Sequence, residues 1–190
     1  MKTIVALLLG AVLLAGCSVG KDAVVQGSDF EFVSPGGKTQ IFYPEGQRQI
    51  LPDLSGDSLL QPGTTIHVSD FPGDIVVLNI WGQWCGPCRA EAPELSTVYD
   101  QTRSRGVRLL GLDVRDDRSA ALDFVHDNQI SYPSIFDPAG RVLLALSGYP
   151  RSVVPSSIVL DRQHRVAAVF LGQITATTLL SELRTLDPTV

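Results

Sequence analysis

A continuous apolar run followed almost at once by two closely spaced cysteines constrains this sequence more than any other feature. The run IVVLNIW (Ile75–Trp81) is rich in β-branched residues and is typical of a strand buried on both faces of a sheet. The motif WCGPC follows at residues 84–88, and apolar positions then recur at helical spacing through residues 86–105. We therefore expect Cys85 at the point where a central strand passes into the N-terminus of a long helix.

This position suits sulfur chemistry. The unpaired N–H groups and the positive end of the helix dipole favour a thiolate at Cys85. Pro87 loses nothing in the first turn, because its missing N–H would have had no partner there. Cys88 comes one turn later, and a disulfide between the two closes so small a ring that it restrains the unfolded chain little. We interpret the pair as a redox-active dithiol in which Cys85, the more exposed and more acidic cysteine, attacks a partner's disulfide and Cys88 resolves the mixed disulfide.

Two other interpretations of the cysteine pair are a passive structural disulfide and a structural zinc site. Zinc would need about four ligands, and the sequence has no second CxxC motif. Its three histidines stand singly and are expected to be surface or satisfied residues: His67, His126 and His164. We expect no metal and no cofactor. The formal net charge of −5, without a clustered basic face, also argues against a nucleic-acid partner.

The N-terminus has the pattern of an export signal. Lys2 is the first charged residue, residues 4–14 are apolar, and small residues precede Cys17. A transmembrane anchor is the alternative, but residues 4–16 would span only about 20 Å as a helix, against about 30 Å of hydrocarbon. LAGC at residues 14–17 resembles a bacterial lipobox, although an ordinary cleavage site with a chance cysteine remains open.

These patterns predict four segments. Residues 1–16 are a signal peptide, residues 17–28 a tether lipidated at Cys17, and residues 29–49 an N-terminal β-hairpin extension built on Phe30, Phe32, Ile41 and Tyr43. Residues 50–187 alternate strands and helices, which predicts an α/β fold with a mixed central sheet flanked by helices. Strands are expected at residues 65–68, 107–114, 154–160 and 165–170, and helices at 119–128 and 175–186, the last capped by Thr175. The mature protein is expected at the extracytoplasmic face of the cell membrane, where disulfides persist.

The segment NIWGQWCGPCRAEAPEL (residues 79–95) resembles the thioredoxin superfamily, specifically the TlpA/ResA-like thiol–disulfide oxidoreductase lipoproteins of bacteria, of mycobacterial type. The resemblance runs over residues 51–186 and includes SDFPGD, VPSSIVLD and a helical insert near residues 119–128. It implies a thioredoxin-like fold in which Pro155 is a cis-proline facing the cysteines. It also implies that Trp84 shields the disulfide and contacts partners.

One position departs from the superfamily pattern. Cytoplasmic thioredoxins carry a buried aspartate where this chain has Asn79, and an amide cannot accept the proton that leaves the buried thiol. Glu91, three residues after Cys88 on the same helical stripe, is the expected substitute. The alternative is that Glu91 simply turns out to solvent at the edge of this stripe.

The direction of electron flow is predicted from the dipeptide Gly86-Pro87, which is typical of reducing members of the superfamily. The resemblance implies a reductant recharged by a membrane electron-donor protein. Its implied targets are protein disulfides such as the CxxCH site of apocytochrome c during cytochrome c maturation. The alternatives are an oxidase or isomerase acting on secreted proteins, and a non-enzymatic lipoprotein binding module on the same fold.

Overall fold

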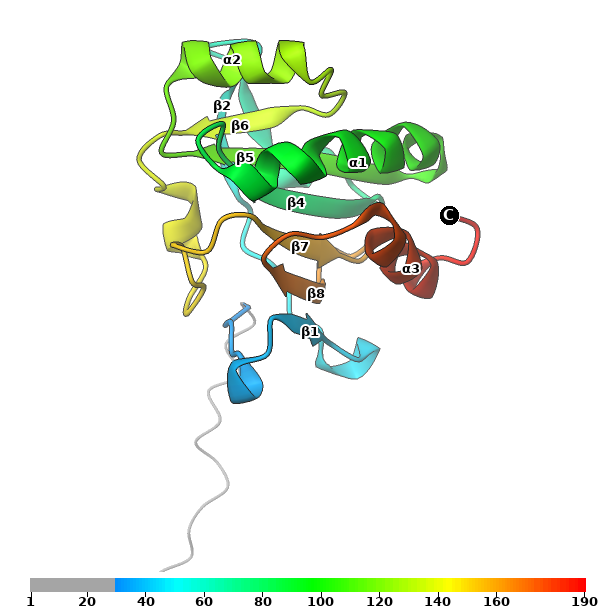
Figure 1. Cartoon of the computed structure of the whole chain (residues 1–190). Coiled ribbons are helices and arrows are strands. Elements are labelled where there is room, and N and C mark those ends of the chain that lie inside the picture. The colour runs from blue at the N-terminus through cyan, green and yellow to red at the C-terminus, as the bar shows by residue number, and fades with distance from the viewer. Residues whose placement is uncertain (1–29) are drawn as a thin grey trace, which may run out of the picture.

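The computed structural model describes residues 30–190, so the predicted signal peptide and the whole predicted tether, with Cys17, lie outside the described residues. One eight-stranded sheet organises the chain (Figure 1). Its order is β1 (Gln40–Phe42), β8 (Val166–Leu171), β7 (Ser156–Leu160), β4 (Ile75–Trp81), β5 (Val107–Val114), β6 (Ser134–Asp137), β2 (Ser55–Ser58) and β3 (Thr65–His67). Strands β4, β5 and β6 run parallel and every other pair is antiparallel, which confirms the predicted mixed sheet.

Three helices cover one face of this sheet: α1 (Gly86–Thr102), α2 (Arg118–Asp127) and α3 (Ala176–Leu186). Leu95 of α1 and Leu183 of α3 are fully buried against Val77 of β4 and its neighbours. The opposite face packs against the segment after β6, through Leu143 and Leu146, and against the N-terminal segment. Within residues 30–190 no helix is long and apolar enough to span a bilayer.

Most predicted elements form close to their expected bounds. The helix expected from residue 86 ends as the 3₁₀ turn Arg103–Arg105, and α2 occupies the place of the predicted insert. Thr175 caps α3, since its Oγ1 accepts a hydrogen bond from the backbone N–H of Thr178 at 3.2 Å. Strand β2 was not predicted. Its sequence SGDS has no alternation of apolar and polar residues that would predict a strand. The strand forms because its backbone pairs with β3 on one side and β6 on the other.

The predicted hairpin within residues 29–49 is wrong. Residues 40–42 form β1, which pairs antiparallel with β8 rather than with the segment before it. Phe30 and Phe32 instead donate backbone hydrogen bonds to Ile50 and Ser147, at 3.0 and 2.9 Å. An isolated two-stranded hairpin is only marginally stable in water. Pairing with the edge of β8 gives β1 backbone hydrogen bonds to the main sheet and lets the extension pack on the sheet's apolar face. The extension therefore completes the main sheet.

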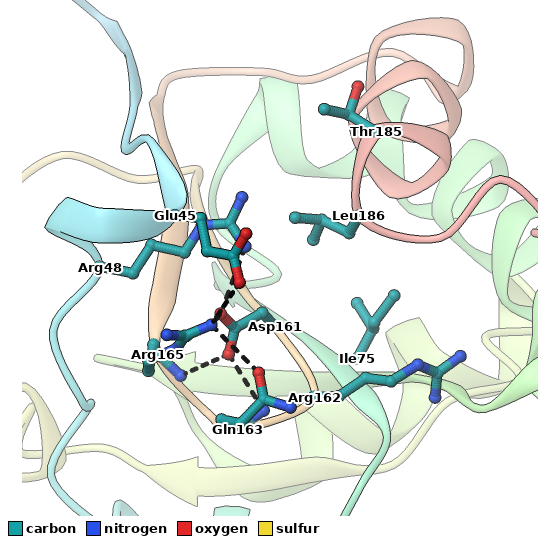
Figure 2. A pocket seen from close by; sticks show the side chains of 9 residues that line it. All are labelled: Glu45, Arg48, Ile75, Asp161, Arg162, Gln163, Arg165, Thr185 and Leu186. Atoms are coloured by element: carbon teal, nitrogen blue, oxygen red, sulfur yellow. Dashed lines mark hydrogen bonds and ion pairs between the residues drawn. The ribbon is translucent and has the colours of Figure 1, made fainter.

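A polar cavity of about 230 Å³ marks where this extension docks (Figure 2). Asp161, in the β7–β8 turn, accepts hydrogen bonds from Arg165 Nε at 2.9 Å and from Arg48 at 3.3 Å. Glu45 adds a weaker ion pair to Arg165 at 3.7 Å. Burial alone would raise the pKa of Asp161. The hydrogen bonds from the two arginines and from the backbone N–H groups of Gln163 and Arg165 lower this pKa overall. Ile75, the first residue of β4, lines the cavity. The cavity therefore lies at the opposite end of β4 from the cysteine motif.

Candidate active site

The cysteine pair lies where strand β4 passes into helix α1, as predicted. Cys85 is the N-cap of α1, and Cys88 lies in its first turn, joined to Cys85 by a disulfide of 2.11 Å. The backbone N–H of Cys88 points at Cys85 Sγ across 3.2 Å. An N-cap sulfur that accepts such a hydrogen bond is placed where a thiolate is stabilised by the unpaired N–H groups of the first turn.

Both sulfur-bearing residues are buried in the disulfide form. Cys85 is 4% exposed and Cys88 1%, so Cys85 is the more accessible of the two by a small margin only. The predicted order of exposure is therefore correct, but both cysteines are buried. The reason is packing: Trp81, Phe124 and the half-buried Val154 form one apolar cluster with both cysteines. Exposed surface begins with the neighbouring residues Trp84, Gly86 and Pro87.

Glu91 lies beneath the disulfide on the buried side of α1. It is 1% exposed, which excludes the alternative that its carboxylate turns out to solvent. Its Oε1 accepts a hydrogen bond from Asn79 Nδ2 at 2.8 Å, and its Oε2 accepts one from the backbone N–H of Ile174 at 3.0 Å. Burial raises the pKa of Glu91 to about 7, although these two hydrogen bonds act in the opposite direction. A carboxyl group with this pKa exchanges protons at neutral pH.

Val154, the residue before Pro155, and Trp84, the residue before Cys85, are neighbours of the cysteine pair. The Val154–Pro155 peptide bond is cis, as the resemblance implied, and Val154 packs against the cluster that contains both cysteines. Trp84 is 44% exposed and its Nε1 donates to the carbonyl of Val114 at 3.1 Å. Trp81, by contrast, is 3% exposed and donates to Ser134 Oγ, which confirms its predicted core position.

Comparison with known proteins agrees with this geometry. The AhpC/TSA family matches residues 48–169, more than half of the chain. The chain belongs to the AhpC/TSA family. The thiol–disulfide oxidoreductase ResA of Bacillus subtilis is 29% identical over 126 residues, which cover 66% of this chain and 69% of ResA.

Two solved structures of relatives are more similar. A secreted thiol-disulfide isomerase from Corynebacterium glutamicum superposes with a TM-score of 0.81 at 48% identity, covering 83% of this chain and 96% of that one. A DsbF homologue from Corynebacterium diphtheriae gives 0.79 at 46% identity, covering 83% and 99%. The predictions of a thioredoxin-like fold and of a thiol–disulfide oxidoreductase with a CxxC redox site are confirmed.

The histidines of this family member have ordinary partners, as predicted. His67 Nδ1 lies 3.1 Å from a carboxylate oxygen of Asp53, and His164 Nε2 lies 3.0 Å from the carbonyl of Phe71. His126 is exposed beside Asp127. Within residues 30–190 no three His, Cys, Asp or Glu side chains are grouped so as to hold a metal ion.

Sequence reasoning missed the segment after β5, which holds the motif from the side. Gln83 donates its backbone N–H to Asp116 Oδ2 at 2.6 Å, and the Arg115 guanidinium lies 4.6 Å from the Trp84 ring centroid. No spacing rule links residues 83–84 to 114–116, because the link depends on the parallel pairing of β4 with β5.

A second buried carboxyl group was also missed. Asp113, paired with Trp81 in the β4–β5 register, is fully buried, and neither carboxyl oxygen has a hydrogen-bond partner within the described residues. Burial, then repulsion from Asp116, raises the pKa of Asp113 to about 8, so this group is neutral at pH 7. A charged residue inside the otherwise apolar strand VRLLGLDV was the available signal.

Proposed function

We propose that this chain is an extracytoplasmic, membrane-anchored reductant of protein disulfides. The observation that carries the proposal is the position of the Cys85–Cys88 pair at the N-terminus of α1, one helical turn from the buried carboxyl group of Glu91. Residues three apart on a helix are surface neighbours, so Glu91 lies on the side of Cys88. The arrangement combines a stabilised nucleophile with a group that can take a proton from the buried thiol.

The exchange has two steps. In the dithiol form, the Cys85 thiolate attacks one sulfur of the partner's disulfide; a mixed disulfide forms and the first partner thiolate leaves. Cys88 then gives its proton to Glu91 and attacks Cys85 Sγ, which closes the Cys85–Cys88 disulfide and releases the second partner thiolate. Two electrons pass to the partner, and the two released thiolates take up the two protons that the dithiol gave up.

The direction rests on Gly86-Pro87, the dipeptide typical of reducing members. A reductant in an oxidising compartment must itself be reduced, which requires a membrane electron-donor protein. The sequence pattern before residue 18 supports export and lipid attachment at Cys17. Residues Pro155 and Trp84 are proposed to border the partner's chain, and the CxxCH segment of apocytochrome c is the proposed target.

Two measurements test this function. Equilibration of the domain with a dithiothreitol or glutathione series should give a potential near that of thioredoxin, about −270 mV. In Cys88→Ser, a mixed disulfide with an oxidised CxxCH peptide should accumulate, because the resolving thiol is gone. Cys85→Ser is the matched control and should trap nothing. If neither variant traps the peptide, Cys85 is inert and the binding-module alternative is correct.

The two Corynebacterium relatives support a second candidate function. At 48% and 46% identity they are described as a secreted thiol-disulfide isomerase and a DsbF homologue. An isomerase or disulfide donor requires a more oxidising pair. A measured potential above about −180 mV would exclude the reductant and support this candidate.

A further inference from the structure

Three consecutive residues, the last of β5 and the two that follow it, hold the dipeptide that precedes the reactive cysteine. The carbonyl of Val114 accepts from Trp84 Nε1 at 3.1 Å, and Asp116 Oδ2 accepts from the Gln83 N–H at 2.6 Å. Between them, Arg115 lays its guanidinium over the Trp84 ring, 4.6 Å from the centroid. This distance is within the range of a cation–π contact. A charged side chain is thus fixed to the aromatic residue next to the redox pair.

The backbone of Arg115 makes this choice of residue informative. Its φ is +55°, in the left-handed region, where glycine and asparagine are strongly favoured and other residues are strained. The turn by itself would therefore be best served by a short residue. A long cation is present instead, which indicates that the position is used for its side chain.

The charge of Arg115 is also unpaired. Among residues 30–190, its guanidinium has no hydrogen-bond or ion-pair partner. The nearest carboxylate in sequence, Asp116, accepts from the backbone N–H groups of Gln83 and Asp117 instead. Trp84 leaves 44% of its surface exposed beside the buried sulfur atoms. The result is an aromatic surface with a free positive charge on it, in a chain whose net charge is −5.

We propose that Arg115 is a specificity-determining residue that binds a carboxylate of the partner polypeptide, next to the disulfide that Cys85 attacks. The inference rests on the proposed exchange with protein disulfides. Trp84 precedes Cys85 directly, so a partner chain that brings its disulfide to Cys85 packs on the indole. A guanidinium presented there binds an aspartate or glutamate side chain through paired N–H···O bonds and repels a basic one.

The test uses three disulfide peptides that differ in one residue flanking the cysteine: glutamate, glutamine or lysine. The pre-reduced domain should reduce the glutamate peptide about threefold faster than the glutamine peptide, and the lysine peptide slowest, as measured by kcat/KM. The preference should shrink in 1 M KCl, because the charges are exposed and screened. Arg115→Asn, which suits the left-handed backbone, should bring the glutamate-to-glutamine ratio to about one. Arg115→Lys should retain a ratio above one.

Arg103→Asn is the matched control. Arg103 also lies over an aromatic ring, 5.9 Å from the centroid of Tyr99, but at the far end of α1, so its loss should leave the ratio unchanged. An equal fall of all three rates in Arg115→Asn would overturn the proposal and assign Arg115 to the thiolate instead. A wild-type ratio of one would overturn it as well. Failure of the proposed function itself is distinct, since the dithiol form would then reduce none of the three peptides.

Discussion

The side-chain amide of Asn79 donates a 2.8 Å hydrogen bond to Glu91 Oε1 and so joins the central strand to the active-site helix beneath the disulfide. Asn79 in turn lies 3.3 Å from Ser157 Oγ on β7. A carboxyl group supplied by the helix is thus held by an amide on the strand. The proposed proton acceptor and Cys88, the thiol that it would serve, therefore lie on the same helix.

Substitution of Glu91 tests its role as the proton acceptor. Because the pKa of Glu91 is raised to about 7, resolution of the mixed disulfide in the wild type should accelerate as pH rises through 7. Glu91→Gln should remove this limb of the pH–rate profile and slow resolution at pH 7.5 by about 10²-fold, at the low end for general-base catalysis. Stopped-flow measurement of the second step from pH 5 to 9 checks this. An unchanged profile would show that Glu91 is not the acceptor.

Glu94→Gln is the control for that experiment. Glu94 is an exposed carboxylate on the same helix, and its charge contributes to the raised pKa of Glu91. Its removal should keep the limb and move it to slightly lower pH.

Asn79→Asp tests the contact itself. A carboxyl group at this position would lie within hydrogen-bond distance of Glu91, and two neighbouring carboxyls share a proton rather than both ionise. The limb of the pH–rate profile should therefore move to higher pH by about one unit or more. A limb that stays near pH 7 would mean that the two side chains are not coupled in solution.

The sequence predicted the central elements well because their signals are local. An all-apolar strand, a proline in the first helical turn and Thr175 as a cap each act within a few residues. The N-terminal hairpin was wrong because β1 takes its partner from β8, about 130 residues later, and no local pattern encodes that choice. The residues of the site also divide into those that a local pattern predicts and those that only the folded sheet brings together. Cys88 and Glu91 share a helix and were predicted together, whereas Arg115 reaches Trp84 only through the folded sheet.

Asp113→Asn should stabilise the protein in a pH-dependent way. The folded pKa is about 8 and the unfolded value about 3.9, so between these values the folded protein holds a proton that the unfolded chain has released. Wild-type stability therefore falls as pH rises through this window, by at most about 1.4 kcal/mol per pH unit from this group. Asparagine does not titrate. The gain of the variant should be small at pH 4, grow toward pH 8 and then level off.

Urea unfolding of both proteins at pH 4.5, 6 and 7.5 measures this gain. The charged groups that face Asp113 are Asp116, Arg118 and Asp137, and all are present in both proteins, so their own titration largely cancels in the difference. Asp123→Asn, an exposed carboxylate on α2, is the control and should show no such trend. A gain that is constant with pH would indicate that Asp113 is ionised in the folded state.

Gly82→Ala tests what holds the Trp84 indole in place beside Cys85. A Cβ at residue 82 would meet the Trp84 indole, with Cε2 only 2.8 Å away, so the ring must move and lose its hydrogen bond to Val114. We expect a red-shifted, more quenchable Trp84 fluorescence against the constant signal of buried Trp81, and a loss of about 1–2 kcal/mol of stability. Gly46→Ala, where a Cβ meets nothing within 4 Å, should change neither quantity. If Gly82→Ala keeps the wild-type fluorescence and stability, Trp84 does not pack against Gly82 in solution. The contact between Arg115 and the Trp84 ring would then not depend on Gly82.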